Sequence, residues 1–323
     1  MVRAVALYVV TLVAVVTIVF SLPRGMPGDP IQARTDAAGP DAITDAATRA
    51  RLLAYYQLDR PLLAQYRNYL GRIVHGDLGW SISRNEPVRD IIGQHLPWTL
   101  LLTGTALTVS SAISFAAGIG AAWRRGRARD ILMVAAMTGA RVLPAYVVAT
   151  VLLLIFAVSF PVLPLAGAQT PFADYTNPIA AMFDIGRYLT LPATALALGQ
   201  LGGKFLVVRN TTIGVLGQDY MLLARAKGLS ERRLKYRHAG RNALLPFMTM
   251  LGLHVGFAVS GALFVETVFG YPGMGSLVLD AVKHVDYPLL EGCFLTLAGA
   301  VLLVNLGIEL AYTRLDPRVS AMP

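Results

Sequence analysis

The run ARAKGLSERRLKYRHAGRN, residues 224–242, is the most basic stretch of the chain. Its cations are Arg225, Lys227, Arg232, Arg233, Lys235, Arg237 and Arg241. Such a segment could only anchor the topology of a membrane protein, or it could lie in a cleft of another protein. It lies between two hydrophobic segments, so the elements around it bear on which of these roles it has.

No recognised motif in the sequence encodes enzyme chemistry. The Gly203-Lys204 pair is followed by Phe205 and lacks the upstream glycine of a phosphate-binding loop, so nucleotide binding is not predicted. There is no HExxH zinc motif, GxSxG nucleophile elbow or plausibly spaced carboxylate dyad. The single cysteine, Cys293, cannot form an intrachain disulfide or a cysteine metal cluster. We therefore expect no catalytic residues, no metal and no cofactor bound by this chain.

The composition predicts an integral membrane protein. Of 323 residues, 55% are apolar and 15% are charged, and the mean hydropathy is +0.57. A spanning helix needs about 20 mostly apolar residues. Six windows satisfy this requirement: 4–23, 96–123, 131–160, 188–208, 242–265 and 288–312. We expect an all-α membrane protein with six transmembrane helices. The first window could instead be a signal peptide, but its apolar run is longer than a signal core.

The distribution of Lys and Arg predicts the orientation, because short cytoplasmic loops retain positive charge. With the N-terminus inside, the cytoplasmic ends and loops are 1–3, 123–130, 209–241 and 313–323. They hold 15 Lys and Arg residues against four acids, whereas the opposite side holds 11 against 12. Both termini are therefore expected in the cytoplasm. The net charge of +9 is mostly a topology signal, and no nucleic-acid partner is expected.

The external side has two long segments. In the region 24–95, apolar and aromatic residues recur at helical spacing after Pro61, which predicts an interfacial helix. Those residues are Leu62, Leu63, Tyr66, Tyr69, Leu70 and Ile73. The helix could cover the bundle or form a docking surface. The segment 161–187 contains four prolines, including Pro178, and is expected to be an irregular loop.

Several polar residues fall inside or beside the apolar windows, where they usually face a cavity or a partner. Glu266 and Glu309 lie near helix ends, Arg141 and Glu291 could line a path or meet a second subunit, and Lys204 could snorkel toward the cytoplasm. His254 is expected to be a packing residue. In the fifth window Gly252, Gly256 and Ser260 recur every fourth residue, a stripe that allows close helix approach within the bundle or between subunits.

The sequence resembles the permease subunits of dipeptide, oligopeptide and nickel ABC importers, the DppB/OppB family, over nearly its whole length. The matching stretches are PGDP at 27–30, QLDRPLLAQY at 57–66, GDLGWS at 76–81, LPLAG at 163–167, LPATAL at 191–196, GQDYMLLARAKGLSERR at 217–233, HAGRNALLP at 238–246, ETVFGYPGMG at 266–275 and LDPR at 315–318. Their order and spacing make the resemblance specific.

The resemblance implies a type I ABC importer permease fold and a role for the basic run. Residues 217–240 would form the cytoplasmic coupling region between the fourth and fifth helices, which inserts into a groove of an ATP-hydrolysing subunit. The implied contact residues are Asp219, Tyr220, Ala224, Arg225, Ala226, Lys227 and Gly228. One departure is clear, because the wider coupling motif begins Glu-Ala-Ala where this chain has Leu222, Leu223 and Ala224.

The resemblance also implies a division of the chain into regions and a set of partners. Residues 1–23 would be the first span, 24–95 the external region and 96–323 the permease core. Glu266, Gly252, Gly256, Arg141 and Glu291 would belong to the translocation path or to the permease interface. The expected partners are a second permease, two ATP-binding cassette subunits that use ATP and Mg, an external or periplasmic binding protein and membrane lipid, all at a bacterial inner membrane.

Two alternatives stay open at this point. The same architecture could import nickel or glutathione, since substrate choice in the family rests mainly on the binding protein. A secondary transporter would also be a polytopic bundle, but it should show repeated halves and broken helices around a midplane ion site. The sequence has no such repeat.

Overall fold

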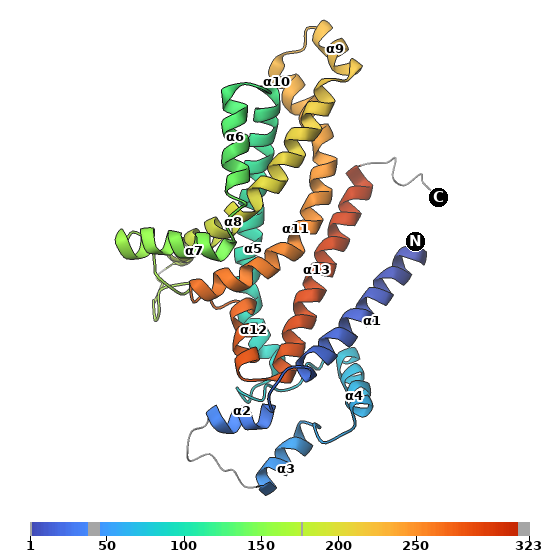
Figure 1. The fold of residues 1–323 in the computed structure, drawn as a ribbon, viewed down its shortest axis with the longest axis vertical. Helices are drawn as coiled ribbons and strands as arrows, with labels where there is room; N and C mark the ends of the chain where they lie inside the picture. Colours follow the sequence, from blue (N-terminus) through green and yellow to red (C-terminus); the bar gives the residue numbers. More distant parts are fainter. Residues whose placement is uncertain (1, 38–45, 176, 316–323) are drawn as a thin grey trace. The chain divides into compact units, whose positions relative to one another are not determined.

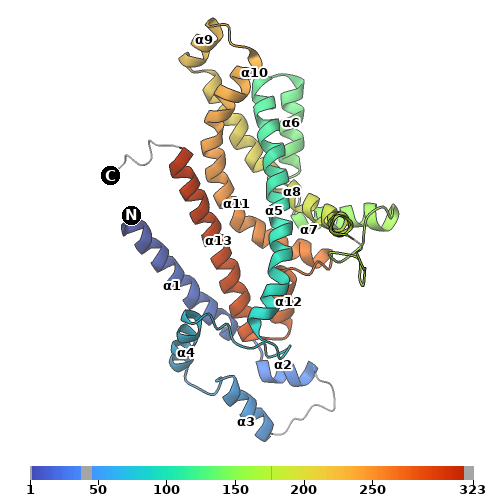
Figure 2. The ribbon, with the colours of Figure 1, turned by 180° about the vertical axis from the view of Figure 1, so that it is seen from behind.

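The computed structural model describes residues 2–37, 46–175 and 177–315, and the side chains of 2–9, 34–37, 46, 48, 253–260 and 309–315 lie outside the description. Within these ranges the regular structure is helical, with one isolated bridge between Trp80 and Pro87 (Figures 1 and 2). Contacts divide the chain into unit 1, residues 1–98 and 273–300, and unit 2, residues 99–272 and 301–323.

Unit 1 contains the helices of the N-terminal third and one late helix. They are α1 (Val2–Arg24), α2 (Pro30–Ala37), α3 (Ala46–Tyr55), α4 (Leu62–Val74) and α12 (Met274–Lys283), with the first parts of α5 (Val88–Trp123) and α13 (Tyr287–Leu315). The interfacial segment predicted after Pro61 is helical, as α4. Its Tyr69 packs with Val16 and Phe20 of α1, because these apolar positions share one helix face.

A buried carboxylate fixes the loop before α5 to the start of α13. Asp286 is fully buried and accepts hydrogen bonds from the Ser81 hydroxyl (2.6 Å) and from the Ser83 amide (2.8 Å) and hydroxyl (2.7 Å). Its other oxygen accepts from the amide of Leu289, as a helix-capping side chain does. Ser81, the last residue of the GDLGWS stretch, therefore has a structural role within unit 1.

Unit 2 is built around one long helix. Its elements are α6 (Ala128–Gly139), α7 (Ala145–Leu153), the π-helix η1 (Leu154–Ser159), α8 (Pro178–Leu216), α9 (Asp219–Ala226), α10 (Glu231–Arg233), the π-helix η2 (Leu234–Gly240) and α11 (Arg241–Val268), with the remaining parts of α5 and α13. Helix α8 packs against α6, α7 and α11. Glycines allow this packing: a Cβ on Gly202 would lie 2.6 Å from the Met137 carbonyl oxygen of α6.

The third apolar window, 131–160, is not one straight helix. It begins in α6, breaks at residues 140–144 and continues as α7, which runs crosswise to α6 in unit 2 (Figures 1 and 2). Pro144 explains the break, since proline disfavours helical backbone at the residue before it and cannot donate the helical hydrogen bond.

The prediction of an irregular loop over 161–187 was wrong for its last ten residues. Helix α8 begins at Pro178, where the Asn177 side chain accepts a hydrogen bond from the Ala180 amide at 2.8 Å. Proline is favoured at the first position of a helix, because its missing N–H has no helical partner there. Pro178 therefore starts a helix instead of indicating a loop.

The chain has the helices of a membrane protein. Among the described residues, three are long and apolar enough to cross a membrane: Val88–Trp123, Pro178–Leu216 and Tyr287–Ile308. Two apolar helices, Val10–Arg24 and Ala145–Ser159, are shorter within that description.

Candidate functional site

The segment singled out by its charge forms a short helix and a sharp turn at one end of unit 2. Helix α9 follows α8 directly and is followed by α10 and η2, which lead into α11 (Figures 1 and 2). The turn is a complete glycine C-cap. The Gly228 amide donates to the Arg225 carbonyl (2.9 Å), and the Leu229 amide donates to the Ala224 carbonyl (3.3 Å).

Gly228 supplies the backbone conformation that this cap needs. Its φ is +75°, in the left-handed region that a side chain disfavours, while the space that a Cβ would occupy is open. Its requirement for glycine is thus conformational and not steric. The break at Gly228, which the sequence indicated, is present in the structure.

One face of α9 is packed against its own unit. Met221 and Ala224 are 1% and 7% exposed, and they form a buried cluster with Leu234 and Ala239 of η2. Partly buried residues from α5, α8 and the turn close this cluster: Trp123, Val215, Leu216 and Leu229. Because Ala224 faces inward, it can act on a partner only by fixing the position of α9.

The opposite face of α9 is open and partly apolar. Leu222 and Leu223 are 60% and 56% exposed and Tyr220 is 44% exposed. Asp219, Arg225, Ala226, Lys227 and Gly228 are also exposed. We call the set Asp219, Tyr220, Leu222, Leu223, Arg225, Ala226 and Lys227 the α9 outer face. An exposed apolar pair beside two cations is unusual for a loop whose only task is to hold topology.

Side-chain contacts tie α9 to α11 and α5, and one more ties α5 to α10. The Asn242 side chain of α11 donates to the Tyr220 hydroxyl at 2.9 Å. The Arg225 guanidinium lies over the ring of Trp123 at 5.7 Å, and the Trp123 indole donates to Glu231 at 3.2 Å. A force applied to α9 is therefore passed to the ends of α5 and α11.

The other cations of the run lie mostly at the surface. Arg232, Arg233, Arg237 and Arg241 are exposed and Lys235 is half-buried. In the described ranges no carboxylate lies within ion-pair distance of any of the seven cations of the run. The surface around α9 is therefore positively charged and available to an acidic partner.

A buried ion pair anchors the neighbouring loop. Arg209 of α8 contacts both oxygens of Asp130 at 2.7 Å, and the Gly126 amide donates to the same carboxylate at 3.0 Å. The Arg209 guanidinium, together with the Gly126 amide, lowers the pKa of Asp130 against the opposing effect of its burial. The pair fixes the α5–α6 loop to α8.

Lys204 departs from the sequence interpretation. The sequence allowed its side chain to snorkel toward the cytoplasm, but the side chain is fully buried. Its ammonium group donates to the hydroxyls of Ser110 (2.7 Å) and Ser111 (3.3 Å) and to the Gln200 side chain (3.0 Å). Snorkelling fails because three neutral acceptors on α5 and α8 satisfy the three donors of the amine inside the unit.

The residues expected at the translocation path or the permease interface belong to different helices and turns. Glu266, near the end of α11, is fully buried and accepts from the Thr99 hydroxyl at 2.6 Å. Glu291 of α13 is 4% exposed and forms an ion pair with Arg24, so its charge is balanced within the chain. Arg141 is exposed in the turn between α6 and α7. These placements leave their roles as predictions.

The small-residue stripe of α11 is only partly described. A Cβ on Gly252 would lie 3.5 Å from the Asn305 side chain and 3.8 Å from Ile308, so Gly252 faces α13 within unit 2. His254, Gly256, Ser260 and Glu309 lie outside the described side chains. These are ordinary contact distances, so the packing within unit 2 does not itself require glycine, and the role of Gly252 at the path or the interface stays a prediction.

Sequence reasoning missed two features of the site. Leu222 and Leu223 were noted only as a departure from a motif, yet they form the apolar part of the α9 outer face. The partners of Lys204 were also missed. Ser110 and Ser111 lie in an apolar window and Gln200 stands one turn before Lys204, which was the available signal.

Comparison with known proteins identifies the family of this chain. The model of the family "Binding-protein-dependent transport system inner membrane component" matches residues 114–321, which is more than half of the chain. The chain belongs to this family.

The curated relatives match nearly end to end. A Brucella ovis protein named as a peptide permease is 38% identical over 310 residues, 95% of this chain and 94% of the relative. The dipeptide transport system permease protein DppB of Escherichia coli is 32% identical, with 98% and 97% covered. The glutathione transport system permease protein GsiC of Salmonella typhimurium is 34% identical, with 96% and 94% covered.

Family membership confirms the resemblance found in the sequence. The chain is a multi-pass inner-membrane permease component of a binding-protein-dependent ABC transport system. As a permease subunit it is not itself the catalytic part of such a system.

Proposed function

We propose that this chain is a permease subunit of an ATP-driven importer of di- and oligopeptides. The observation that carries the proposal is its similarity, over 95% of its length or more, to proteins named as peptide and dipeptide permeases. A separate binding protein delivers the peptide, and a second permease forms the translocation path together with this chain.

The proposed topology has six spans with both termini in the cytoplasm. Supporting it are the six apolar windows and the excess of Lys and Arg on the expected inner loops. In this topology α9 and the basic run are cytoplasmic, whereas α2, α3 and α4 are external. Glu266 and Arg141 are retained as candidates for the path or the permease interface, because Glu266 directly follows the fifth apolar window and Arg141 interrupts the third.

Helix α9 is the proposed coupling helix. Its outer face enters a groove of one of two ATP-binding cassette subunits, which bind ATP and Mg. Leu222 and Leu223 supply apolar contact area, and Arg225 and Lys227 meet acidic groups at the rim. The packed face, through Ala224 and Met221, passes the movement of the groove to α8, η2 and α5.

In the transport cycle the chain does mechanical work and no covalent chemistry. ATP binding closes the two ATPase subunits, the α9 segments of the paired permeases move with them, and the path changes from inward-facing to outward-facing. Hydrolysis reverses the movement. The contacts of Trp123, Glu231 and Asn242 keep α9 from moving independently of the spanning helices.

Glutathione is the second candidate substrate, because the GsiC relatives are as similar to this chain as the dipeptide permeases. The two candidates share a peptide-like backbone, so one permease surface could serve either. A proteoliposome assay with the cognate binding protein separates them by direct competition.

The experiment that tests the proposal is co-expression of the whole transport system. The tagged chain should copurify with ATPase subunits in detergent, and the complex should take up a labelled dipeptide only with ATP and binding protein. Charge reversal at Arg225 and Lys227 should leave membrane insertion intact and separate ATP hydrolysis from uptake. Uptake without ATPase subunits, driven by an ion gradient, would overturn the proposal in favour of a secondary transporter.

A further inference from the structure

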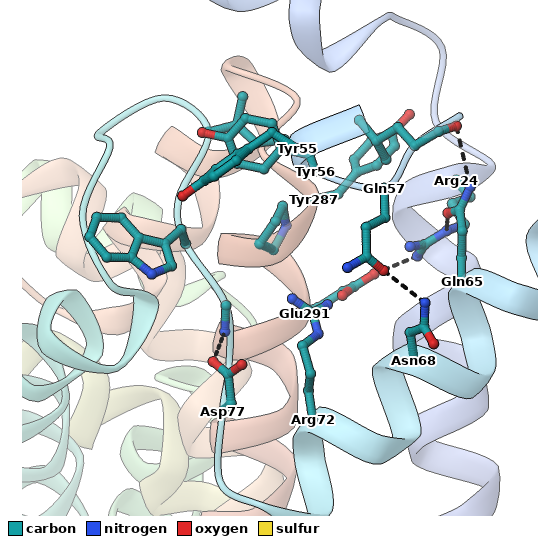
Figure 3. Close-up of a pocket in the computed structure, with 15 residues that line it drawn as sticks. Arg24, Tyr55, Tyr56, Gln57, Gln65, Asn68, Arg72, Asp77, Tyr287 and Glu291 are labelled. Carbon is teal, nitrogen blue, oxygen red and sulfur yellow. Dashed lines mark hydrogen bonds and ion pairs between the residues drawn. The ribbon is translucent and has the colours of Figure 1, made fainter. Parts of the chain in front are cut away.

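Unit 1 contains a pocket that the proposed coupling mechanism does not use. It has a volume of about 240 Å³ and lies among α1, the α3–α4 connection, the 77–82 loop and the start of α13 (Figure 3). The volume is slightly below the roughly 300–1,000 Å³ of sites for drug-sized ligands. It suits a molecule about as large as an amino acid or a dipeptide.

One wall of the pocket is an ion pair whose charges are already balanced. Arg24 pairs with Glu291, donates to the Phe20 carbonyl (2.6 Å) and to Gln65 (3.1 Å), and lies over the Phe20 ring at 3.5 Å. Its charge is thus balanced by Glu291, and its Nε and one terminal nitrogen are engaged in hydrogen bonds. This pair shapes the pocket but adds little net charge to it.

Arg72 of α4 is the second cation of the pocket, which the carboxylates of Glu291 and Asp77 also line. Within the described part of the chain no carboxylate lies within ion-pair distance of its guanidinium. Figure 3 shows its side chain extending from α4 toward the Glu291 side chain at the pocket wall. Gly79 makes room for it, since a Cβ there would lie 2.8 Å from an Arg72 nitrogen. A fork of N–H donors facing an open pocket is suited to a carboxylate.

Gln57 adds a polar group at a backbone position that normally favours glycine. It follows the last turn of α3 with φ of +57°, and the next amide, Leu58, donates to the Leu53 carbonyl at 2.8 Å. Its side-chain oxygen accepts from Asn68 at 2.8 Å beside Arg72. Backbone strain held in place by such a contact is often found at binding sites.

The approach to the pocket is positively charged. An open hollow of about 530 Å³ adjoins it and shares Gln57, Asn68, Arg72 and Asp77 with it. Arg60, Arg67 and His75 complete the rim of that hollow. Asp77, its one acidic lining residue, already accepts a hydrogen bond from the Gly79 amide. The hollow therefore draws anions toward Arg72.

The geometry of α4 favours a soluble ligand over a phospholipid. The exposed apolar residues Leu63, Leu70 and Val74 lie about half a turn around the helix from Arg72. Acyl chains that cover those residues would lie on the side of α4 opposite the pocket. The body of the ligand instead meets the aromatic side chains of Tyr55, Tyr56, Trp80 and Tyr287.

We propose that this pocket is an accessory site for the carboxylate end of a small peptide, with Arg72 as the anchoring cation and Gln57 and Asn68 as its polar neighbours. The choice of a peptide as the ligand rests on the proposed function. The site itself rests on Arg72, which has no ion-pair partner among the described residues, on the strained Gln57 and on the basic approach.

The test is binding of alanyl-phenylalanine to the full chain in nanodiscs of zwitterionic lipid, measured by calorimetry. The free acid should bind, and its C-terminal amide should bind at least tenfold more weakly. N-acetylation should matter much less. Equal affinity of acid and amide, or no binding of the acid at millimolar concentration, would overturn the proposal.

Three substitutions make the test specific. Arg72→Gln should weaken binding of the acid at least tenfold, while Arg51→Gln, an exposed arginine of α3 that lines neither the pocket nor the hollow, should change it less than threefold. Gln57→Gly suits the backbone at that position, so it should keep the fold and still weaken binding. Equal losses in the two arginine variants would reduce the site to general charge attraction and overturn it.

Two further measurements are needed. One distinguishes a peptide from a lipid in the pocket, and the other distinguishes failure of the site from failure of the proposed function. If anionic phospholipid displaces the dipeptide and is retained through Arg72, the pocket is a lipid site and the proposal fails. If the assembled complex transports peptides normally but the pocket binds none, the site fails and the proposed function stands. If the pocket binds the peptide through Arg72 but the complex shows no ATP-driven peptide uptake, the site stands and the proposed function fails.

Discussion

Replacement of Gly228 tests how closely transport depends on the position of α9. At φ of +75° an alanine costs about 1–2 kcal/mol relative to glycine, and the open space around the position adds no steric cost. The cap that ends α9 should then be populated roughly 5- to 30-fold less relative to open conformations. Gly228→Pro should do more damage, because proline cannot adopt this φ and removes the amide that donates to Arg225.

The assay is the amount of dipeptide taken up per ATP hydrolysed by the assembled complex in proteoliposomes. We expect this ratio to fall severalfold in Gly228→Ala and to approach zero in Gly228→Pro, with membrane insertion unchanged. Gly126 provides a matched control. Its φ is +78° and the space around it is also open, but it lies in the α5–α6 loop and not on α9.

The outcome for the control decides the interpretation. Gly126→Ala carries the same backbone cost and should keep a normal ratio of uptake to hydrolysis. If both alanine variants lose coupling equally, the effect is a general loss of stability. Normal uptake per ATP in Gly228→Pro would refute the reasoning, because the turn would then have no part in coupling.

Three further substitutions test the packing around the site by thermal unfolding of the purified chain. Arg209→Met leaves the Asp130 carboxylate without its main partner, and the loss of charged hydrogen bonds should cost about 1.5–3 kcal/mol. Because the folded pKa of Asp130 is below its unfolded value of 3.8, this contribution is present above that value and disappears as pH falls through the folded pKa. The melting temperatures of wild type and Arg209→Met should therefore converge at acidic pH, and a constant difference would contradict this. Gly202→Ala should destabilise unit 2, since its Cβ would lie 2.6 Å from the Met137 oxygen, whereas Gly199→Ala, with its nearest contact at 3.8 Å, should be neutral or stabilising. Asn177→Ala should cost about 1 kcal/mol through loss of the α8 cap and Asn177→Asp should retain most of it, so equal stability of all three chains would exclude a capping role.

Sequence reasoning succeeded where local chemistry decides the structure. The helical spacing after Pro61 predicted α4, because Tyr66, Tyr69 and Ile73 fall on one helix face and pack against α1. Gly228 predicted the turn after α9, since few other residues adopt its conformation without cost. The apolar windows predicted a membrane protein, because the spanning requirement follows from length and composition alone.

It failed where a residue has two possible roles that only the neighbours decide. Pro178 could end a loop or start a helix, and the Asn177 cap determined which. Lys204 could extend to the surface or stay inside, and Ser110 on a helix far away in sequence supplied the partner. The exposure of Leu222 and Leu223 depended on which face of α9 packs against η2, and a helix of eight residues leaves that choice to tertiary contacts.

Site-directed cross-linking from α9 tests the central claim most directly. Cys293 is the single native cysteine and is buried, so Leu223→Cys in a Cys293→Ala chain places one exposed thiol on the α9 outer face. In membranes that contain the complete transporter, this thiol should cross-link to an ATPase subunit and resist impermeant reagents added outside. The thiol of Leu63→Cys on α4 should react with impermeant reagents added outside and should not cross-link to an ATPase subunit. Labelling of the α9 thiol from the outside, or its failure to reach any ATPase subunit in the assembled complex, would contradict the account.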